Sequence, residues 1–143
     1  MTLVELLVVL GVVGVIVGMS VPALAGYAKQ LRLKTTTRQV VGLLSLARSL
    51  AISSRENHAV VIDPERRKIS VVNMASGEAL EQVVRLPPSV TVDVQMGDHP
   101  SPGRVVFRPT GSLEGRTVWL ILADRERHQT VTVTGTTGAV SVQ

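Results

Sequence analysis

The sequence contains no cysteine, which excludes a disulfide framework, a thiolate nucleophile and a zinc–thiolate site. Aromatic residues are also scarce, with one Trp, one Tyr and one Phe among 143 residues. A collagen-like or wholly disordered chain is excluded as well, because hydrophobic residues make up 45% of the sequence and no repeat is present. The length suits about one domain.

Charge is missing from the N-terminal part of the chain. Residues 1–28 carry one charged side chain, Glu5, and residues 6–28 carry none. As a helix, this uncharged run would be roughly 34 Å long, enough to cross a hydrocarbon core of about 30 Å. We therefore expect a transmembrane segment, and the rest of the chain is basic.

Two other interpretations of this segment stay open. Residues 23–25 read Ala-Leu-Ala, like a signal-peptidase site, but a signal peptide would begin with basic residues rather than an acid. A buried core helix would need a much larger protein around it. The basic residues Lys29, Arg32 and Lys34 favour a cytoplasmic location for the chain after the span, unless a basic leader precedes it.

A second helical pattern begins directly after the apolar run. From residue 39 onward, apolar residues recur at helical spacing and Arg and Ser lie off that stripe, which predicts an amphipathic helix with one buried face. No loop signal separates it from the apolar run. We expect one helix over about residues 2–54, weakest at the β-branched residues Thr35, Thr36 and Thr37.

After residue 54 the spacing of the apolar residues changes to a period of two, which is typical of strands. The fold class is therefore α+β: a long N-terminal helix packs with its second half on an antiparallel β-sheet domain. We expect the membrane or filament half of the helix over 1–28 and a globular domain over 29–143, made of helix 29–54 and sheet 57–143. The expected strands are 59–63, 68–74, 80–86, 90–94, 104–108, 117–123, 130–134 and 139–142, with a hairpin turn at 64–67 and a loop at 97–103.

Glu5 is the most informative residue. A carboxylate in a membrane helix costs roughly 2.5–3.5 kcal/mol, which makes it a candidate functional residue. Thr2 and Glu5 also match a helix capping box, and an acid in the first turn suits the helix dipole. Alternatively, the carboxylate pairs with a free amine at Met1, either within one chain or between the helices of two chains.

The first nine residues, Met-Thr-Leu-Val-Glu-Leu-Leu-Val-Val, resemble the mature N-terminus of type IV pilins and type II secretion pseudopilins. The resemblance implies that a prepilin peptidase removes a short basic leader and methylates Met1, and that Glu5 serves filament assembly. It also implies an anchor in the bacterial inner membrane, with the C-terminal domain in the periplasm. Other pilin or pseudopilin subunits would be the partners, and membrane lipid would surround the helix before assembly.

Three further residues of the helix are candidates for packing and shape. Pro22 removes a backbone hydrogen bond to Gly18, so we expect a kink or local melting there. Related pilins often carry a proline at this position, although a tolerated membrane proline explains it equally well. Gly14 and Gly18 form a small-xxx-small pattern that permits close helix approach.

The second half of the chain resembles the GspH/FimT family of minor pilin-like proteins. The resemblance rests on residues 46–51, on the step Phe107-Arg-Pro109-Thr-Gly111, and on the strand that contains Trp119. We expect Phe107 in the core, Pro109 at a strand end and Gly111 with positive φ. The resemblance implies a minor pseudopilin near the tip of a type II secretion pseudopilus, or alternatively a FimT-like minor pilin of a type IV pilus that binds DNA in natural transformation.

No pattern points to catalysis, a cofactor or a metal. His58, His99 and His128 lack ligand spacing, and we expect each to be solvated. The basic residues are mixed with acids, and the cluster 66–68 is expected to be a solvated turn. Arg125 and Arg127 are the candidate DNA contacts, but the shortage of aromatic residues leaves no stacking platform and makes DNA the less favoured partner.

Overall fold

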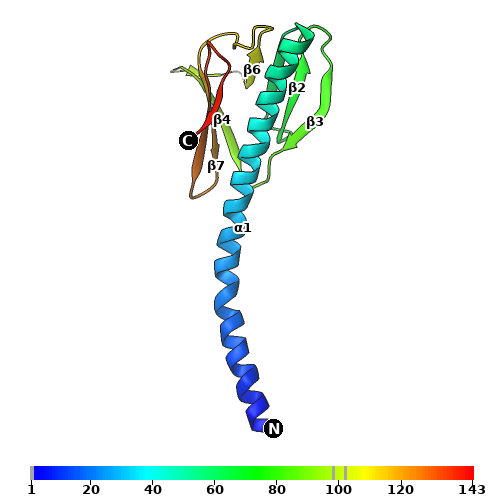
Figure 1. The fold of residues 1–143 in the computed structure, drawn as a ribbon. Coiled ribbons are helices and arrows are strands. Elements are labelled where there is room, and N and C mark those ends of the chain that lie inside the picture. Colours follow the sequence, from blue (N-terminus) through cyan, green and yellow to red (C-terminus); the bar gives the residue numbers. More distant parts are fainter. Residues whose placement is uncertain (1, 98, 102) are drawn as a thin grey trace. The chain divides into compact units, whose positions relative to one another are not determined.

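The computed structural model describes residues 2–97, 99–101 and 103–143, without the side chains of residues 21–25, 29, 30 and 100. The chain divides into two compact units, Met1–Arg32 and Leu33–Gln143, called unit 1 and unit 2 below. One helix, α1 (Leu3–Ser54), runs through the boundary without interruption (Figure 1). The expected single helix is therefore confirmed.

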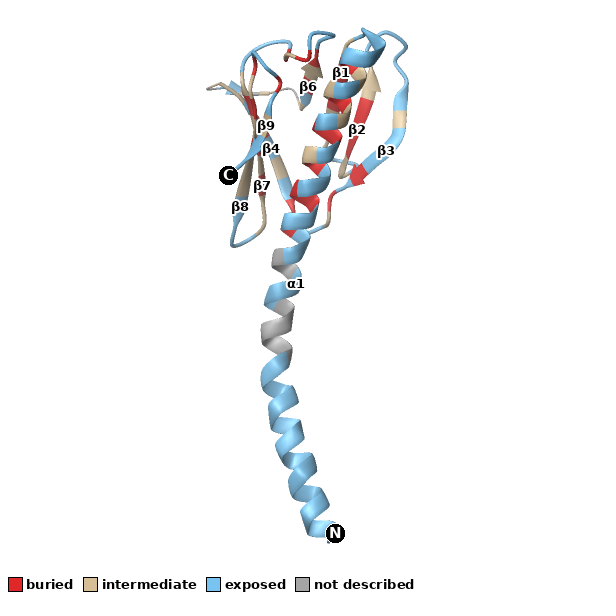
Figure 2. Cartoon of the chain, in the orientation of Figure 1, coloured by how far each residue is buried: buried red, intermediate tan, exposed pale blue. Residues whose placement is uncertain are grey.

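The side chains that the structure describes in unit 1 form no core. Every described side chain from Thr2 to Ser20 is exposed, and Leu3 and Met19 are 76% and 75% exposed (Figure 2). The segment Leu3–Ser20 is long and apolar enough to cross a membrane. Apolar residues all round a helix predict burial in lipid or protein.

In unit 2 the same helix is amphipathic, with one buried face, as the spacing of its apolar residues predicts. Its buried residues form a stripe that belongs to the hydrophobic core of the domain (Figure 2). The members of this stripe are Leu33, Val40, Leu43, Leu44, Ala47 and Ala51. Residues 35–37, where helix propensity is weakest, are helical too. Thr36 and Thr37 are buried, and the hydroxyl of Thr37 donates to the Leu33 carbonyl at 2.9 Å.

The strands form two antiparallel sheets, a division that the sequence pattern does not reveal. The four-stranded sheet has the order β3-β2-β1-β6, and the five-stranded sheet has the order β5-β4-β7-β8-β9. Their bounds are β1 His58–Asp63, β2 Lys68–Asn73, β3 Ala79–Arg85, β4 Thr91–Met96, β5 His99–Pro100, β6 Arg104–Phe107, β7 Val118–Ala123, β8 His128–Val133 and β9 Val140–Val142. The expected loop 97–103 therefore contains one short strand, β5, which pairs with the end of β4.

The core lies where the apolar faces of both sheets meet the second half of α1. Phe107 is fully buried, as expected, together with Ile69 and Val71 of the first sheet and Leu120 and Leu122 of the second. Every residue of this core cluster belongs to unit 2. Unit 2 therefore has a continuous core made of its own residues.

Three distant segments meet at the turn after β6. Gly111 has φ of +80°, as expected, and its carbonyl accepts a hydrogen bond from Arg48 Nε of α1 at 3.1 Å. A Cβ at Gly138 would overlap this same carbonyl oxygen, and Gly138 has φ of +64°. The missing side chain at Gly138 therefore lets the chain before β9 lie close against the turn and Arg48 of the helix.

The substitution Gly138→Ala should lower the free energy of unfolding by about 3 kcal/mol or more, because it adds both a backbone clash and left-handed strain. Gly77→Ala is the matched control, since Gly77 has φ of +74° but open space around it. It should cost about 1 kcal/mol. Denaturant unfolding of both variants tests this, and equal losses would contradict the role of close approach.

Candidate functional site

The N-terminal turn of α1 is held by the capping box that the sequence predicts. The Thr2 amide donates to Glu5 Oε2 at 3.4 Å, and the Glu5 amide donates to Thr2 Oγ1 at 3.3 Å. Both distances exceed the usual 2.9–3.0 Å, so the two bonds are weak. Amide donors are neutral, so this geometry orients the carboxylate without neutralising its charge.

Lipid or protein around this turn would leave Glu5 with an unmatched charge. Within unit 1 of the sequence, the nearest basic side chain is Lys29, more than six helical turns away. Met1, whose amine is the other candidate partner, lies outside the described residues. Its methylation and its pairing with Glu5 stay predictions.

The packing residues of the helix lie on an open surface. An added Cβ at Gly14 or Gly18 would have no neighbouring atom within 4 Å, so within the single chain no other segment packs against the small-xxx-small pattern. The helix is continuous through Pro22, whose side chain is outside the described part. The kink at Pro22 and the packing at the two glycines therefore stay predictions.

One of the basic residues expected in a solvated turn has a structural role. Arg67, between β1 and β2, is half-buried, and its guanidinium donates to the backbone carbonyls of Leu86, Pro87 and Val90. It also has φ of +51°. The solvated interpretation was wrong for Arg67 because the segment between β3 and β4 folds over it, a long-range contact that no local pattern reports.

The other members of this cluster are more accessible. Arg66 has a side chain that is 74% exposed, with Nε 3.8 Å from Asp63 Oδ2. Lys68 is half-buried and lies directly opposite Arg85 in the β2–β3 ladder. Together with Glu81 and Leu86, these residues line a shallow pocket at the end of the four-stranded sheet.

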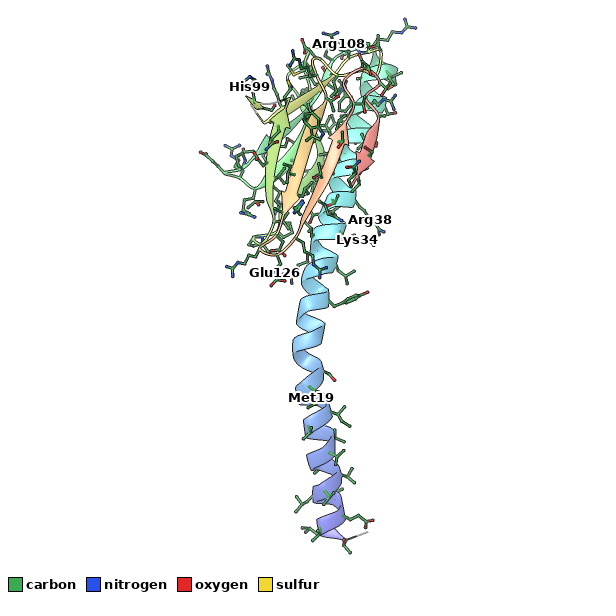
Figure 3. The ribbon with its side chains drawn as sticks, turned by 90° about the vertical axis from the view of Figure 1, so that its left-hand side faces the viewer. Met19, Lys34, Arg38, His99, Arg108 and Glu126 are labelled. Carbon is green, nitrogen blue, oxygen red and sulfur yellow. The ribbon has the colours of Figure 1, made fainter. Side chains whose placement is uncertain are left out.

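The candidate DNA contacts lie in the turn between β7 and β8. Arg125 and Arg127 are exposed, and Glu126 of the same turn is at the end of unit 2 that also carries Lys34 and Arg38 (Figure 3). The Arg125 amide donates to Asp124 Oδ1 at 2.7 Å, which shapes the turn. Contact with DNA stays a prediction for both arginines.

The three histidines differ in their surroundings. His99 and His128 are exposed, as expected. His58 is only 4% exposed, and its Nδ1 lies 3.1 Å from the Glu56 carbonyl, so the solvated interpretation was wrong there. It is the first residue of β1, opposite Phe107 and Asn73, and this pairing places it on the core side. Within residues 2–97, 99–101 and 103–143, no three His, Asp or Glu side chains form a group that could hold a metal ion.

A groove separates α1 from the edge strand β3. It is lined by Gln39, Gly42 and Leu46 of the helix and by Gln82 and Val83 of the strand, among others. β3 pairs with β2 on one side only, so its other edge leaves backbone groups that another chain could pair with. Sequence reasoning missed this feature, because an edge is defined only once the strand order is known.

The comparisons with known proteins agree on a family and a fold. A model of the family described as type II transport protein GspH matches residues 36–137. The type IV minor pilin FimU of Pseudomonas aeruginosa is 14% identical, with a TM-score of 0.65 over 82% of this chain and 92% of the other. The minor pseudopilin EpsH from the type II secretion system of Vibrio cholerae is 16% identical, with a TM-score of 0.62 over 78% and 94%. No curated protein sequence matches this chain.

Removing the Arg67 side chain should destabilise the protein even though it belongs to a basic turn. Arg67→Ala leaves three carbonyl groups without their charged donor and should lower the free energy of unfolding by about 2–4 kcal/mol. Arg66→Ala removes an exposed ion-pair partner and should change it by about 0.5 kcal/mol or less. Thermal or denaturant unfolding measures both, and a similar small effect at the two positions would disprove the structural role of Arg67.

Proposed function

Because the chain belongs to the GspH family of type II transport proteins, we propose that it is a minor pseudopilin of a type II secretion pseudopilus, positioned near the tip. The family match carries this proposal. The chain would be a structural subunit without catalytic activity of its own, and it would support protein export across the outer membrane through its contacts with other subunits.

The exposed apolar helix supports membrane anchoring before assembly. Leu3–Ser20 has no burial within the chain, so water would face a long apolar surface. A patch of this size requires lipid or protein to cover it. We infer that the inner membrane covers it first, with unit 2 in the periplasm, and that helices of neighbouring subunits replace the lipid in the filament.

Glu5 supports the change from membrane to filament. Only one of the two capping bonds reaches the carboxylate, the 3.4 Å bond from the Thr2 amide. A bond of normal length to a charged group is worth about 1.5–3 kcal/mol, so this long bond does not offset the roughly 2.5–3.5 kcal/mol cost of a carboxylate in a membrane helix. A cation is therefore needed to balance it. The terminal amine of a neighbouring subunit, created when prepilin peptidase cuts before Met1, would supply that charge and set the stagger between two helices.

The alternative is a minor pilin of a type IV pilus, since FimU shares the fold. At 14% identity this likeness concerns the fold alone, whereas the family match is to a type II transport protein. The subunits that co-purify with the native protein distinguish the two systems. Recovery with type IV pilus subunits, and without secretion pseudopilins, would refute the proposed system.

Three variants separate pairing from capping at Glu5. Glu5→Gln keeps an acceptor for the Thr2 amide but removes the charge, so it should enter the membrane and fail to enter filaments. Glu5→Ala should likewise enter the membrane and fail to enter filaments. Thr2→Ala removes the hydroxyl acceptor and keeps the charge, so it should assemble.

The measurement is the fraction of each variant in sheared or affinity-purified filaments, relative to the amount in the membrane. The pairing account expects at least about a tenfold drop for both Glu5 variants, since it loses more than 1.4 kcal/mol of charge interaction. Normal assembly of Glu5→Gln would mean that the capping box is sufficient.

A further inference from the structure

The positive charge of unit 2 is concentrated at one end. Unit 2 has 13 Lys and Arg and ten Asp and Glu in its sequence, yet the end where α1 enters has eight of these cations and only five of the carboxylates. We call this the basic end. Its cations are Lys34, Arg38, Arg66, Arg67, Lys68, Arg85, Arg125 and Arg127, and its carboxylates are Asp63, Glu65, Glu81, Asp124 and Glu126.

Contacts connect the parts of the basic end. The Arg67 guanidinium reaches the Val90 carbonyl at 2.8 Å, and Val90 precedes β4. The first residue of β4, Thr91, lies opposite Ala123 at the end of β7, and its hydroxyl donates to the Ala123 carbonyl at 3.3 Å. The turn with Arg125 and Arg127 comes next. Figure 3 shows Lys34, Arg38 and Glu126 at this end and Arg108 at the other.

Lys68 and Arg85 place two cations directly opposite each other on this surface. Like charges directly opposite each other in an antiparallel ladder are destabilising. Both side chains line the same shallow pocket as Arg66, with Glu81 as its one acid. Among the described residues, the ion pair that forms here joins Arg66 to Asp63, not Glu81 to Lys68 or Arg85. An anion between Lys68 and Arg85 would remove their repulsion.

The turn that presents these cations is held in place. Arg67 bonds three backbone carbonyls of the segment 86–90, so the backbone on both sides of Lys68 and Arg85 is cross-linked. Binding an anion here therefore costs little ordering of the backbone. The cations are also spread over a helix, two hairpin turns and a strand end, which suits a charged surface better than one small ion.

The chain itself limits how far this end lies from the membrane. Leu33, where unit 2 begins, lies five residues after Ala28, the last of the uncharged run. Five residues span about 8 Å as a helix and at most about 18 Å extended. The first value is close to the Debye length of about 8 Å in physiological salt, so a charge next to Leu33, such as Lys34, would sense a charged membrane.

We propose that the basic end binds the phosphate headgroups of anionic phospholipids in the membrane that holds unit 1, with the Lys68–Arg85 pair as its central contact. This rests on the proposed membrane anchor. Headgroup binding would keep unit 2 down on the membrane before assembly. The contacts would break when the subunit is drawn into a filament, so the anionic lipid content would tune how readily the subunit leaves.

The test uses the full chain in lipid nanodiscs made of phosphatidylcholine, with or without phosphatidylglycerol. Lys68 is the reporter, because it is the one lysine outside α1. Its acetylation by an amine-reactive reagent is followed by mass spectrometry. Phosphatidylglycerol should slow acetylation of Lys68 about tenfold at low salt, and high salt should restore the rate.

Two variants provide the matched controls. Arg108→Lys places a reporter at the opposite end of unit 2, and its acetylation should be the same in both discs. Arg66→Gln with Arg85→Gln removes two neighbouring cations and should reduce the slowing at Lys68 to about threefold or less. Equal slowing at position 108, or full slowing in the double variant, would contradict a localised site.

The remaining outcomes distinguish failure of headgroup binding from failure of the membrane anchor, and lipid headgroups from other anionic ligands. Equal Lys68 rates in both discs overturn the lipid inference while co-elution with the discs still supports the anchor. If the protein co-elutes with neither disc, both the lipid inference and the membrane anchor are overturned. If phosphatidylglycerol has no effect but inorganic phosphate or duplex DNA slows Lys68 in phosphatidylcholine discs, the surface recognises a free anion or nucleic acid, and the lipid proposal is wrong.

Discussion

The apolar surface of Leu3–Ser20 is the constraint on which the rest of the molecule depends. This segment is exposed on all sides in the single chain, with one carboxylate at its start. Hydrophobic burial is proportional to the area removed from water, so the segment needs either lipid or other helices. The same apolar surface is compatible with both environments, as a subunit that moves from membrane to filament requires. In the proposed pairing, the amine of a neighbouring subunit at Glu5 would distinguish the filament from the membrane.

Unit 2 forms its core from its own residues. Its core contains residues from Leu33 onward, and the second half of α1 packs on two sheets. The contacts that close the domain are long-range bonds from arginine side chains to backbone carbonyls: Arg48 reaches the turn at Gly111, and Arg67 reaches the segment before β4. These two arginines are structural, whereas Lys68 and Arg85 lie at the surface for an anionic partner.

Local patterns predicted the parts of this structure that depend on neighbouring residues. The continuous helix, the turn at 64–67, the buried Phe107 and the positive φ of Gly111 all follow from spacing or from a single residue's backbone preference. The burial of His58, the role of Arg67, the short strand β5 and the division into two sheets depend on which strands pair, and a single sequence does not contain that information. The candidate site divides in the same way. The capping box at Glu5 was predictable from four adjacent residues, but the basic end requires the positions of two hairpins that are far apart in sequence.

The central claim is that the apolar half of α1 leaves lipid for the helices of other subunits. A photo-crosslinking residue at Val13, within the exposed segment, tests it most directly in cells that contain or lack the remaining secretion subunits. The account predicts a covalent adduct with another pseudopilin only when the other subunits are present, and lipid adducts alone when they are missing. Lipid adducts alone in the cells that contain the other subunits, from protein that co-purifies with the filament, would contradict it.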